Sequence, residues 1–203
     1  AKLIDAGDQL DLQDKNGDTM LILASMKSQT EIVVKMIAKN AKLNLQNKVG
    51  YTALMCAINK GDTETVAKLI DAGAKLDVQD EDGTRAMILA INKGDTKTAA
   101  KLIDAGDQLD LQDKNGDTML ILASMKSQTE IVVKMIAKNA KLNLQNKVGY
   151  TALMCAINKG DTETVAKLID AGAKLDVQDE DGTRAMILAI NKGDTKTAAK
   201  LID

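Results

Sequence analysis

The sequence predicts an all-α solenoid, in which short helix–turn–helix units stack on one another. Three observations predict it. Residues 1–99 recur without a change as residues 100–198, and residues 199–203 begin a third copy. Inside each 99-residue block, similar segments follow one another with a period of 33 residues. Each segment carries two helical patterns that are too short to be stable alone, so neighbouring segments must cover each other's apolar faces.

The 33-residue period divides the chain into five whole repeats and two partial ones. Gly17, Gly50 and Gly83 occupy the same position in successive repeats. We therefore predict a single array over residues 1–203. Its repeats are residues 1–13 (partial), 14–46, 47–79, 80–112, 113–145, 146–178 and 179–203 (partial).

The first helix of a repeat is clearest in residues 47–79. Thr52 is expected to cap a short helix that runs to Asn59 and turns its apolar side chains inward. The pair Lys60–Gly61 should end this helix, because glycine favours the left-handed conformation found at helix ends.

The second helix of the same repeat should begin at Asp62, a favoured N-cap residue. Val66, Leu69 and Ile70 follow at spacings of three and four, which predicts one apolar stripe. Gly73 should end the helix in the left-handed conformation.

The repeat at residues 14–46 differs at both ends of its second helix. Asn40 takes the position of the terminal glycine, and asparagine tolerates the left-handed conformation best after glycine. Ser28 and Glu31 have the spacing of a capping box, which predicts that Ser28 caps this helix.

The segment between repeats, such as residues 74–83, alternates apolar and polar residues and ends in a glycine turn. This pattern favours a short extended arm and a tight turn.

Composition argues against an enzyme. The chain has no His, Trp, Phe or Pro, so a Ser-His-Asp triad, a Cys-His pair and a His-ligated zinc are all excluded. No glycine-rich phosphate loop is present, and the acidic loops that begin at Asp14 and Asp80 lack the spacing of a calcium loop. We expect no catalysis, no metal and no cofactor. With 45% hydrophobic residues, the core must be aliphatic, with ten methionines as filler.

The charge balance and the cysteine content limit the class of partner and the cellular compartment that we expect. The 27 basic and 29 acidic residues nearly balance, which argues against nucleic acid as a partner. No apolar run approaches the roughly 20 residues of a membrane span. Cys56 and Cys155 are interpreted as free, buried thiols, which favours an intracellular (cytoplasmic), reducing compartment.

The repeats resemble ankyrin repeats along the whole chain. Residues 50–57, GYTALMCA, are similar to the G-x-T-P-L-H-x-A signature of that family, and residues 61–77 are similar to its second helix and G-A-D-V-N loop. The resemblance implies an ankyrin-repeat solenoid, a right-stacked elongated array with a helix–turn–helix and a β-turn or hairpin loop in every 33 residues.

At two positions of the family signature, this chain has other residues in all three repeats of a block. The family's Pro is replaced by Met20, Ala53 and Ala86, and its His by Ile22, Met55 and Ile88. The family's polar link between repeats is therefore absent, and cohesion should be more hydrophobic. Thr19 and Thr52 keep their capping role, whereas Arg85 replaces the third threonine and leaves its cap open to doubt.

The resemblance also implies a protein–protein interaction scaffold that uses the turn tips and the concave face of the first helices. Tyr51 is either a binding anchor or a cover for its own turn, and Lys27, Lys60 and Lys93 are either a binding row or a solvated face. Other turn-tip positions are Lys15, Asn16, Asp18, Lys48, Glu81, Asp82 and Thr84. The candidate partner-binding residues are Met26, Lys27, Val49, Tyr51, Asn59, Lys60, Asn92, Lys93, Met125, Lys126, Val148, Tyr150, Asn158, Lys159, Asn191 and Lys192.

Two other functions remain open. A structural solenoid that assembles by head-to-tail stacking is the first, because the pattern places both ends of the chain inside second helices and shows no polar capping repeats. A regulatory segment of a larger protein is the second. The identical blocks favour a fragment of a longer array or an engineered tandem.

Overall fold

The computed structural model describes residues 10–202, and these contain helices and loops but no strand. One isolated antiparallel bridge joins Gln178 and Arg184. The chain divides into two compact units, Ala1–Asp107 and Gln108–Asp203. Unit 1 holds α1 (Met20–Met26), α2 (Thr30–Ala38), α3 (Ala53–Lys60), α4 (Thr63–Asp71), α5 (Ala86–Lys93) and α6 (Thr96–Asp104). Unit 2 holds α7 (Met119–Met125), α8 (Thr129–Ala137), α9 (Ala152–Lys159), α10 (Thr162–Asp170), α11 (Ala185–Asn191) and α12 (Thr195–Lys200).

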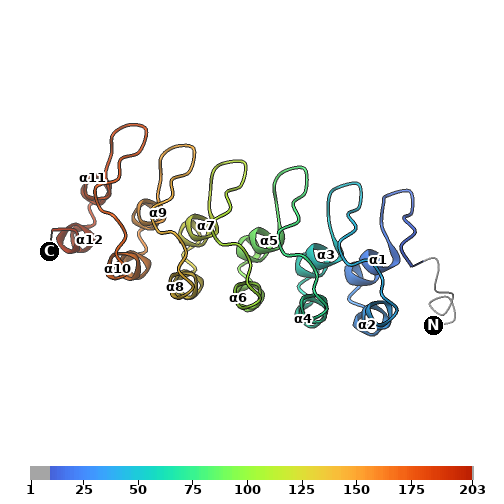
Figure 1. Cartoon of the computed structure of the whole chain (residues 1–203). Coiled ribbons are helices and arrows are strands. Elements are labelled where there is room, and N and C mark those ends of the chain that lie inside the picture. The colour runs from blue at the N-terminus through green and yellow to red at the C-terminus, as the bar shows by residue number, and fades with distance from the viewer. Residues whose placement is uncertain (1–9, 203) are drawn as a thin grey trace. The chain divides into compact units, whose positions relative to one another are not determined.

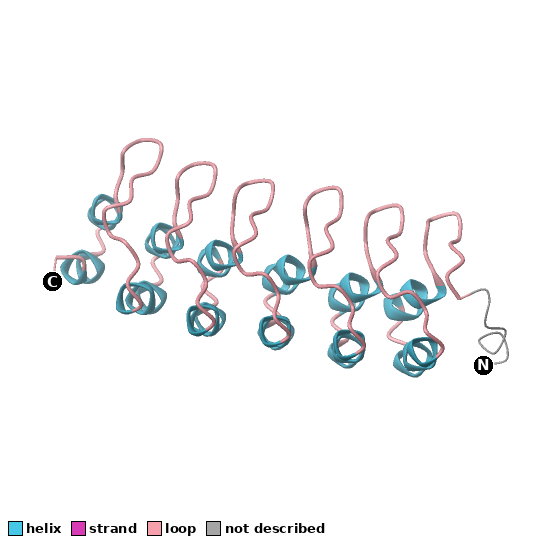
Figure 2. Cartoon of the chain, in the orientation of Figure 1, coloured by secondary structure: helices cyan, strands magenta, loops and turns pink. Residues whose placement is uncertain are grey.

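Within each unit the helices form two rows. In unit 1 the first helices α1, α3 and α5 pack side by side, and the second helices α2, α4 and α6 form the other row (Figure 1). The long loops project from the side of the first helices, as Figure 2 shows. Unit 2 repeats this arrangement with α7, α9 and α11 in one row and α8, α10 and α12 in the other. The predicted helix–turn–helix solenoid is confirmed.

The core lies between the two rows and between successive repeats. On α3 the side chains of Leu54, Met55 and Ile58 are buried, and so are Val66 and Leu69 of α4, which packs against α3. Ile22, Met55 and Ile88, which stand where the family has His, are all buried. Apolar side chains therefore fill this position in the core of unit 1, and the more hydrophobic cohesion between repeats stays a prediction.

Most predicted helix ends are confirmed. The Thr52 hydroxyl oxygen accepts a hydrogen bond from the Met55 amide at 3.3 Å, and the Asp62 carboxylate accepts one from the Thr65 amide at 3.0 Å. Gly61 and Asn40 both have left-handed backbones, with φ of 79° and 61°. Local sequence therefore determines where these helices stop.

The predicted cap at Ser28 is wrong. Gln29 occupies the N-cap position of α2 and makes no side-chain capping hydrogen bond. Ser28 has a φ of 53° because it takes the position of Gly61, the left-handed residue that ends the first helix. The capping-box spacing to Glu31 is therefore a coincidence.

Arg85 also makes no capping hydrogen bond at the start of α5. Its side chain is buried instead, and its Nη1 lies 3.2 Å from the Oδ1 of Asp107, whose side chain is also buried. Both residues belong to the repeat at 80–112, and the repeat at 47–79 has Thr52 and Ala74 at these positions. The start of α5 therefore lacks the side-chain cap that Thr52 gives to α3, and the repeat has a buried ion pair instead.

The division into repeats stays a prediction. Residues 1–9 and 203, which carry most of the partial repeat 1–13 and the end of the repeat at 179–203, lie outside the described residues. A single array over residues 1–203 stays a prediction.

Candidate protein-binding surface

Each loop ends in a turn that one side chain holds together. At the tip of residues 47–51, the Asn47 Oδ1 accepts hydrogen bonds from the amides of Val49 and Tyr51, at 3.2 and 2.9 Å. The Asn47 amide donates to the Tyr51 carbonyl, and the Gly50 amide donates to the Asn47 carbonyl. Asp80 holds the next tip in the same way. The tips are therefore closed turns whose backbone is fixed by these hydrogen bonds.

Neighbouring tips of unit 1 are in direct contact. The Lys48 amide donates to the Asn16 carbonyl at 2.9 Å, and the Asn47 side chain donates to the Asp18 carboxylate at 2.8 Å. Asp18 is consequently buried, and its carboxylate links two repeats instead of facing a partner. A Cβ at Gly50 would come within 2.7 Å of the Asp80 Cα, so only glycine allows this approach.

A glutamine ladder, which sequence reasoning missed, joins the bases of the loops. The Gln46 side chain donates to the Gly50 carbonyl of its own tip at 2.6 Å and to the Gln79 carbonyl of the next repeat at 2.8 Å. Gln13 repeats this pattern one repeat earlier, with Gln46 as its neighbour. The signal was available, because a glutamine recurs every 33 residues at this position.

The sixteen candidate residues all reach the surface. Val49 and Val148 are 62% and 53% exposed at the loop tips, and Met26 is 45% exposed at the end of α1. Tyr51 and Tyr150 are half-buried, whereas the remaining members of the set are exposed.

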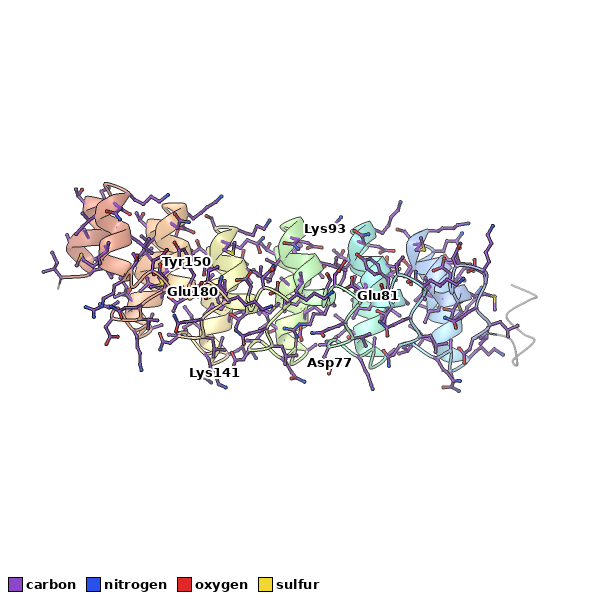
Figure 3. The ribbon with its side chains drawn as sticks, turned by 90° about the horizontal axis from the view of Figure 1, so that it is seen from above. Asp77, Glu81, Lys93, Lys141, Tyr150 and Glu180 are labelled. Carbon is purple, nitrogen blue, oxygen red and sulfur yellow. The ribbon has the colours of Figure 1, made fainter. Side chains whose placement is uncertain are left out.

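The structure separates the candidate residues into two bands. The tip band is Val49, Tyr51, Val148 and Tyr150, and the helix-end band is the other twelve candidates. Tyr51 lies just before α3 and Lys60 is its last residue, so a helix of eight residues, about 12 Å long, lies between them. Asn59 and Lys93 come together at the helix ends, where the Lys93 ammonium donates to the Asn59 carbonyl at 2.8 Å. In Figure 3, Lys93 lies at the margin of unit 1, away from Glu81 on the loop tips.

The tip band is the more acidic of the two. The pKa of the Tyr51 phenol is raised, first by partial burial and then by the negative charges of Asp80 and Asp82 on the next tip. In unit 2 the pKa of Tyr150 is raised by burial and by Asp179 and Asp181. Figure 3 shows Tyr150 beside Glu180.

The cysteines lie under this surface and are free and buried. Burial, followed by the charge of Asp18, raises the pKa of the Cys56 thiol to about 12. Burial and the charge of Asp117 raise the pKa of Cys155 to about 12 as well. Both thiols are protonated at neutral pH and are poor nucleophiles.

Among residues 10–202 no group of three acidic or cysteine side chains is placed to hold a metal ion. In the same residues no helix is both long and apolar enough to cross a membrane.

A family model for three-copy ankyrin repeats matches residues 1–80, 59–146 and 130–203. The chain belongs to the ankyrin repeat family. Ankyrin repeat domains are generally protein–protein interaction modules, and no catalytic family is indicated for this one. No curated protein sequence matches the chain.

Solved ankyrin structures share this fold. An ankyrin repeat domain from Acinetobacter baumannii AYE is 26% identical, with 90% of this chain and 95% of that chain covered and a TM-score of 0.85. The ankyrin repeat domain of Bcl-3, from the IκB protein family, is 22% identical over 99% and 90%, with a TM-score of 0.87. A chain of the complex between the endopeptidase Bd0816 and the immunity protein Bd3460 of Bdellovibrio bacteriovorus is 27% identical over 94% and 98%, with a TM-score of 0.77.

Proposed function

We propose that this ankyrin protein is a non-enzymatic scaffold that binds a protein partner across its turn tips and the exposed side of its first helices. This proposal rests on the exposure of Val49 and Val148 at the tips of their loops, next to half-buried tyrosines. Exposed apolar side chains and tyrosines are typical of binding anchors.

The rigidity of the tips supports the same function. The Asn47 side chain closes its own turn, and a backbone hydrogen bond from Lys48 to Asn16 connects the turn to the preceding tip. Side chains that are held in place before binding lose less conformational entropy when a partner arrives. Tyr51 is thereby suited to act as an anchor as well as to cover its turn.

A comparative pull-down from the source cells tests this function. We expect the wild-type chain to retain a protein that the variant V49D/Y51A/V148D/Y150A does not retain. A matched control, K68A/K167A, changes exposed residues on the second helices α4 and α10 and should retain the partner as the wild type does. Loss of the partner from the control with retention by the tip variant would place binding on the other row of helices.

The buried thiols support an intracellular, reducing compartment. Cys56 and Cys155 are 99 residues apart in sequence, and each is free and buried in its own unit. Disulfides are rare in proteins of such compartments.

Self-association is a second candidate, and two isoleucines favour it. Ile187 and Ile190 on α11 are 44% and 62% exposed. The equivalent side chains one repeat earlier, Met154 and Ile157, are at most 1% exposed because α11 packs against α9. We infer that a second copy of the chain can cover this apolar face by head-to-tail stacking.

Light scattering over a concentration series tests this candidate. We expect the average mass to rise with concentration for the wild type, and to stay that of a monomer for I190S. Serine occupies the equivalent position 124, so this substitution is compatible with the fold. A wild-type chain that stays monomeric at high concentration would exclude the candidate.

A further inference from the structure

The loop tips of each unit combine an exposed valine, a tyrosine and carboxylates in one place. In unit 1 the Gly50 backbone lies against Asp80 so closely that a Cβ would not fit, which brings Val49 and Tyr51 next to the acidic tip that follows. In unit 2 the Glu180 amide lies 3.4 Å from the Val148 carbonyl. We call these surfaces patch 1 and patch 2. Patch 1 is Val49, Tyr51 and Glu81, and patch 2 is Val148, Tyr150 and Glu180.

The charge around each patch is negative on balance. At the tip that follows Tyr51, Asp80 and Glu81 stand in succession, and Glu81 is exposed. Lys48 is the basic residue of the preceding tip, so carboxylates outnumber ammonium groups. A cationic side chain placed here would meet opposite charge, and its methylene groups could pack on the valine. The tyrosine ring offers a further attraction to a cation.

On the basis of the proposed function, we infer that patch 1 and patch 2 are two equivalent sites for the same ligand chemistry: a cationic peptide segment of the partner that carries one apolar side chain. Each site lies inside its own unit and is built by the same residue types, because residues 47–82 and 146–181 are identical in sequence. One chain therefore binds two such segments.

The two sites make the chain bivalent. A partner with two copies of the segment would gain avidity without any new contact, provided that its linker spans both patches. If the partner has one copy of the segment, two partner molecules would bind to each chain.

Two pools of twelve-residue peptides are the probe for this inference. Both carry one Leu, Ile or Trp at the centre. The flanks are Lys, Arg and Ser in the cationic pool, and Asp, Glu and Ser in the acidic pool. We expect the immobilised full chain to retain the cationic pool at least about tenfold more strongly in 0.1 M than in 0.5 M salt, because screening shortens the range of charge attraction. Retention of the acidic pool, or of neither pool, would overturn the inference.

Charge-reversed variants identify the sites. E81K/E180K should lose at least about tenfold in retention of the cationic pool, because like charges oppose each other at an interface. The control K68E/K167E alters exposed residues of the second helices α4 and α10 and should not weaken retention. A control that loses retention while E81K/E180K keeps it would place the site on the second helices.

Calorimetry with the most strongly retained peptide counts the sites. We expect two peptides per wild-type chain, one for E81K and one for E180K. A wild-type stoichiometry of one would overturn the claim of two equivalent sites. The outcome is separable from the scaffold function: if the V49D/Y51A/V148D/Y150A variant loses its cellular partner but no cationic peptide binds, the scaffold stands and this inference fails.

Discussion

Arg85 is the largest of the fully buried side chains in the described part of the molecule, and Asp107 is one of its partners. Desolvation by burial lowers the pKa of Arg85, and the charge of Asp107 opposes that effect. The guanidinium nevertheless remains charged at neutral pH. A buried ion pair is costly to break from one side but is often replaceable as a whole.

We predict that D107A lowers the free energy of unfolding by about 3–5 kcal/mol, because it leaves a buried guanidinium without this carboxylate. The double variant R85T/D107A, which restores the residues of the neighbouring repeat, should cost less than D107A alone. Urea denaturation of the single and double variants measures both values.

Arg184 provides the matched control for this cycle. It is the equivalent residue of the second block and is exposed. R184T should change the free energy of unfolding by no more than about 0.5 kcal/mol, as is usual for surface substitutions. R85T completes the cycle: if R85T/D107A costs as much as R85T and D107A together, Arg85 and Asp107 do not act as a pair.

The pair at Arg85 could not be predicted from sequence. Arg85 and Asp107 are 22 residues apart, and no helical or turn spacing relates them. The register of the repeats did show that Arg85 departs from the threonine position, and this correctly put its cap in doubt. The partner appears only when the loop after α6 folds back toward the start of α5.

At the scale of the helix, Asp62 caps α4 and titrates differently from an exposed aspartate. Burial opposes its ionisation, but hydrogen bonds from Thr65 and Thr30 outweigh that effect and lower its pKa below the ordinary 3.8. A carboxylate whose pKa is lowered by folding stabilises the fold above its ordinary pKa, and this contribution disappears as the pH falls through the lowered value.

We predict that D62A costs about 0.5–2 kcal/mol at pH 7 and less at pH 3, because pH 3 lies below the ordinary pKa of 3.8 and the stabilisation from the charged cap is smaller there. D62N is the matched control, because asparagine caps equally well but does not titrate. Thermal unfolding of the three proteins between pH 3 and 7 checks this. An equal loss for D62A at both pH values would show that the charge of Asp62 is irrelevant.

Two glycines with the same backbone test the packing of the tips. Gly50 and Gly61 both have a φ of 79°, but a Cβ would be 2.7 Å from the Asp80 Cα at Gly50 and would meet nothing within 4 Å at Gly61. G61A should therefore cost only the strain of a left-handed alanine, about 1–2 kcal/mol. G50A should cost more, because the neighbouring tip must also move.

Chemical denaturation of both alanine variants measures the difference. Equal losses for G50A and G61A would mean that the tips are not in contact as described. A larger loss for G50A should be accompanied by weaker binding of the cationic peptide at patch 1, because that patch depends on the close approach of Gly50 to Asp80.

The helices were predictable because their signals are local and are repeated. Asp62, Gly61 and Asn40 each mark a helix end by their own chemistry. The prediction for Ser28 was wrong because the residue also matches a four-residue capping motif by chance, whereas the repeat register places it at the position of Gly61. The register is the stronger signal, because stacking forces equivalent residues into equivalent conformations.

At the scale of the whole molecule, the candidate surface was only partly predictable. The sixteen candidate residues that the resemblance implied are at least partly exposed, and their role in binding stays a prediction. The resemblance grouped Tyr51 with Lys60, whereas the structure places them at opposite ends of α3. It also counted Asp18 as a tip residue, although Asn47 of the next repeat binds its carboxylate. Such contacts depend on the neighbouring repeat and are invisible within a single motif.

Site-specific photo-crosslinking tests most directly whether a protein partner binds at the loop tips. A photoreactive amino acid is placed at Val49 or Val148, both on tips, or at the exposed Lys68 or Lys167 on the second helices. We expect crosslinks to the retained partner from positions 49 and 148, in similar yield, and none from positions 68 and 167. Crosslinks from positions 68 and 167 alone would contradict it.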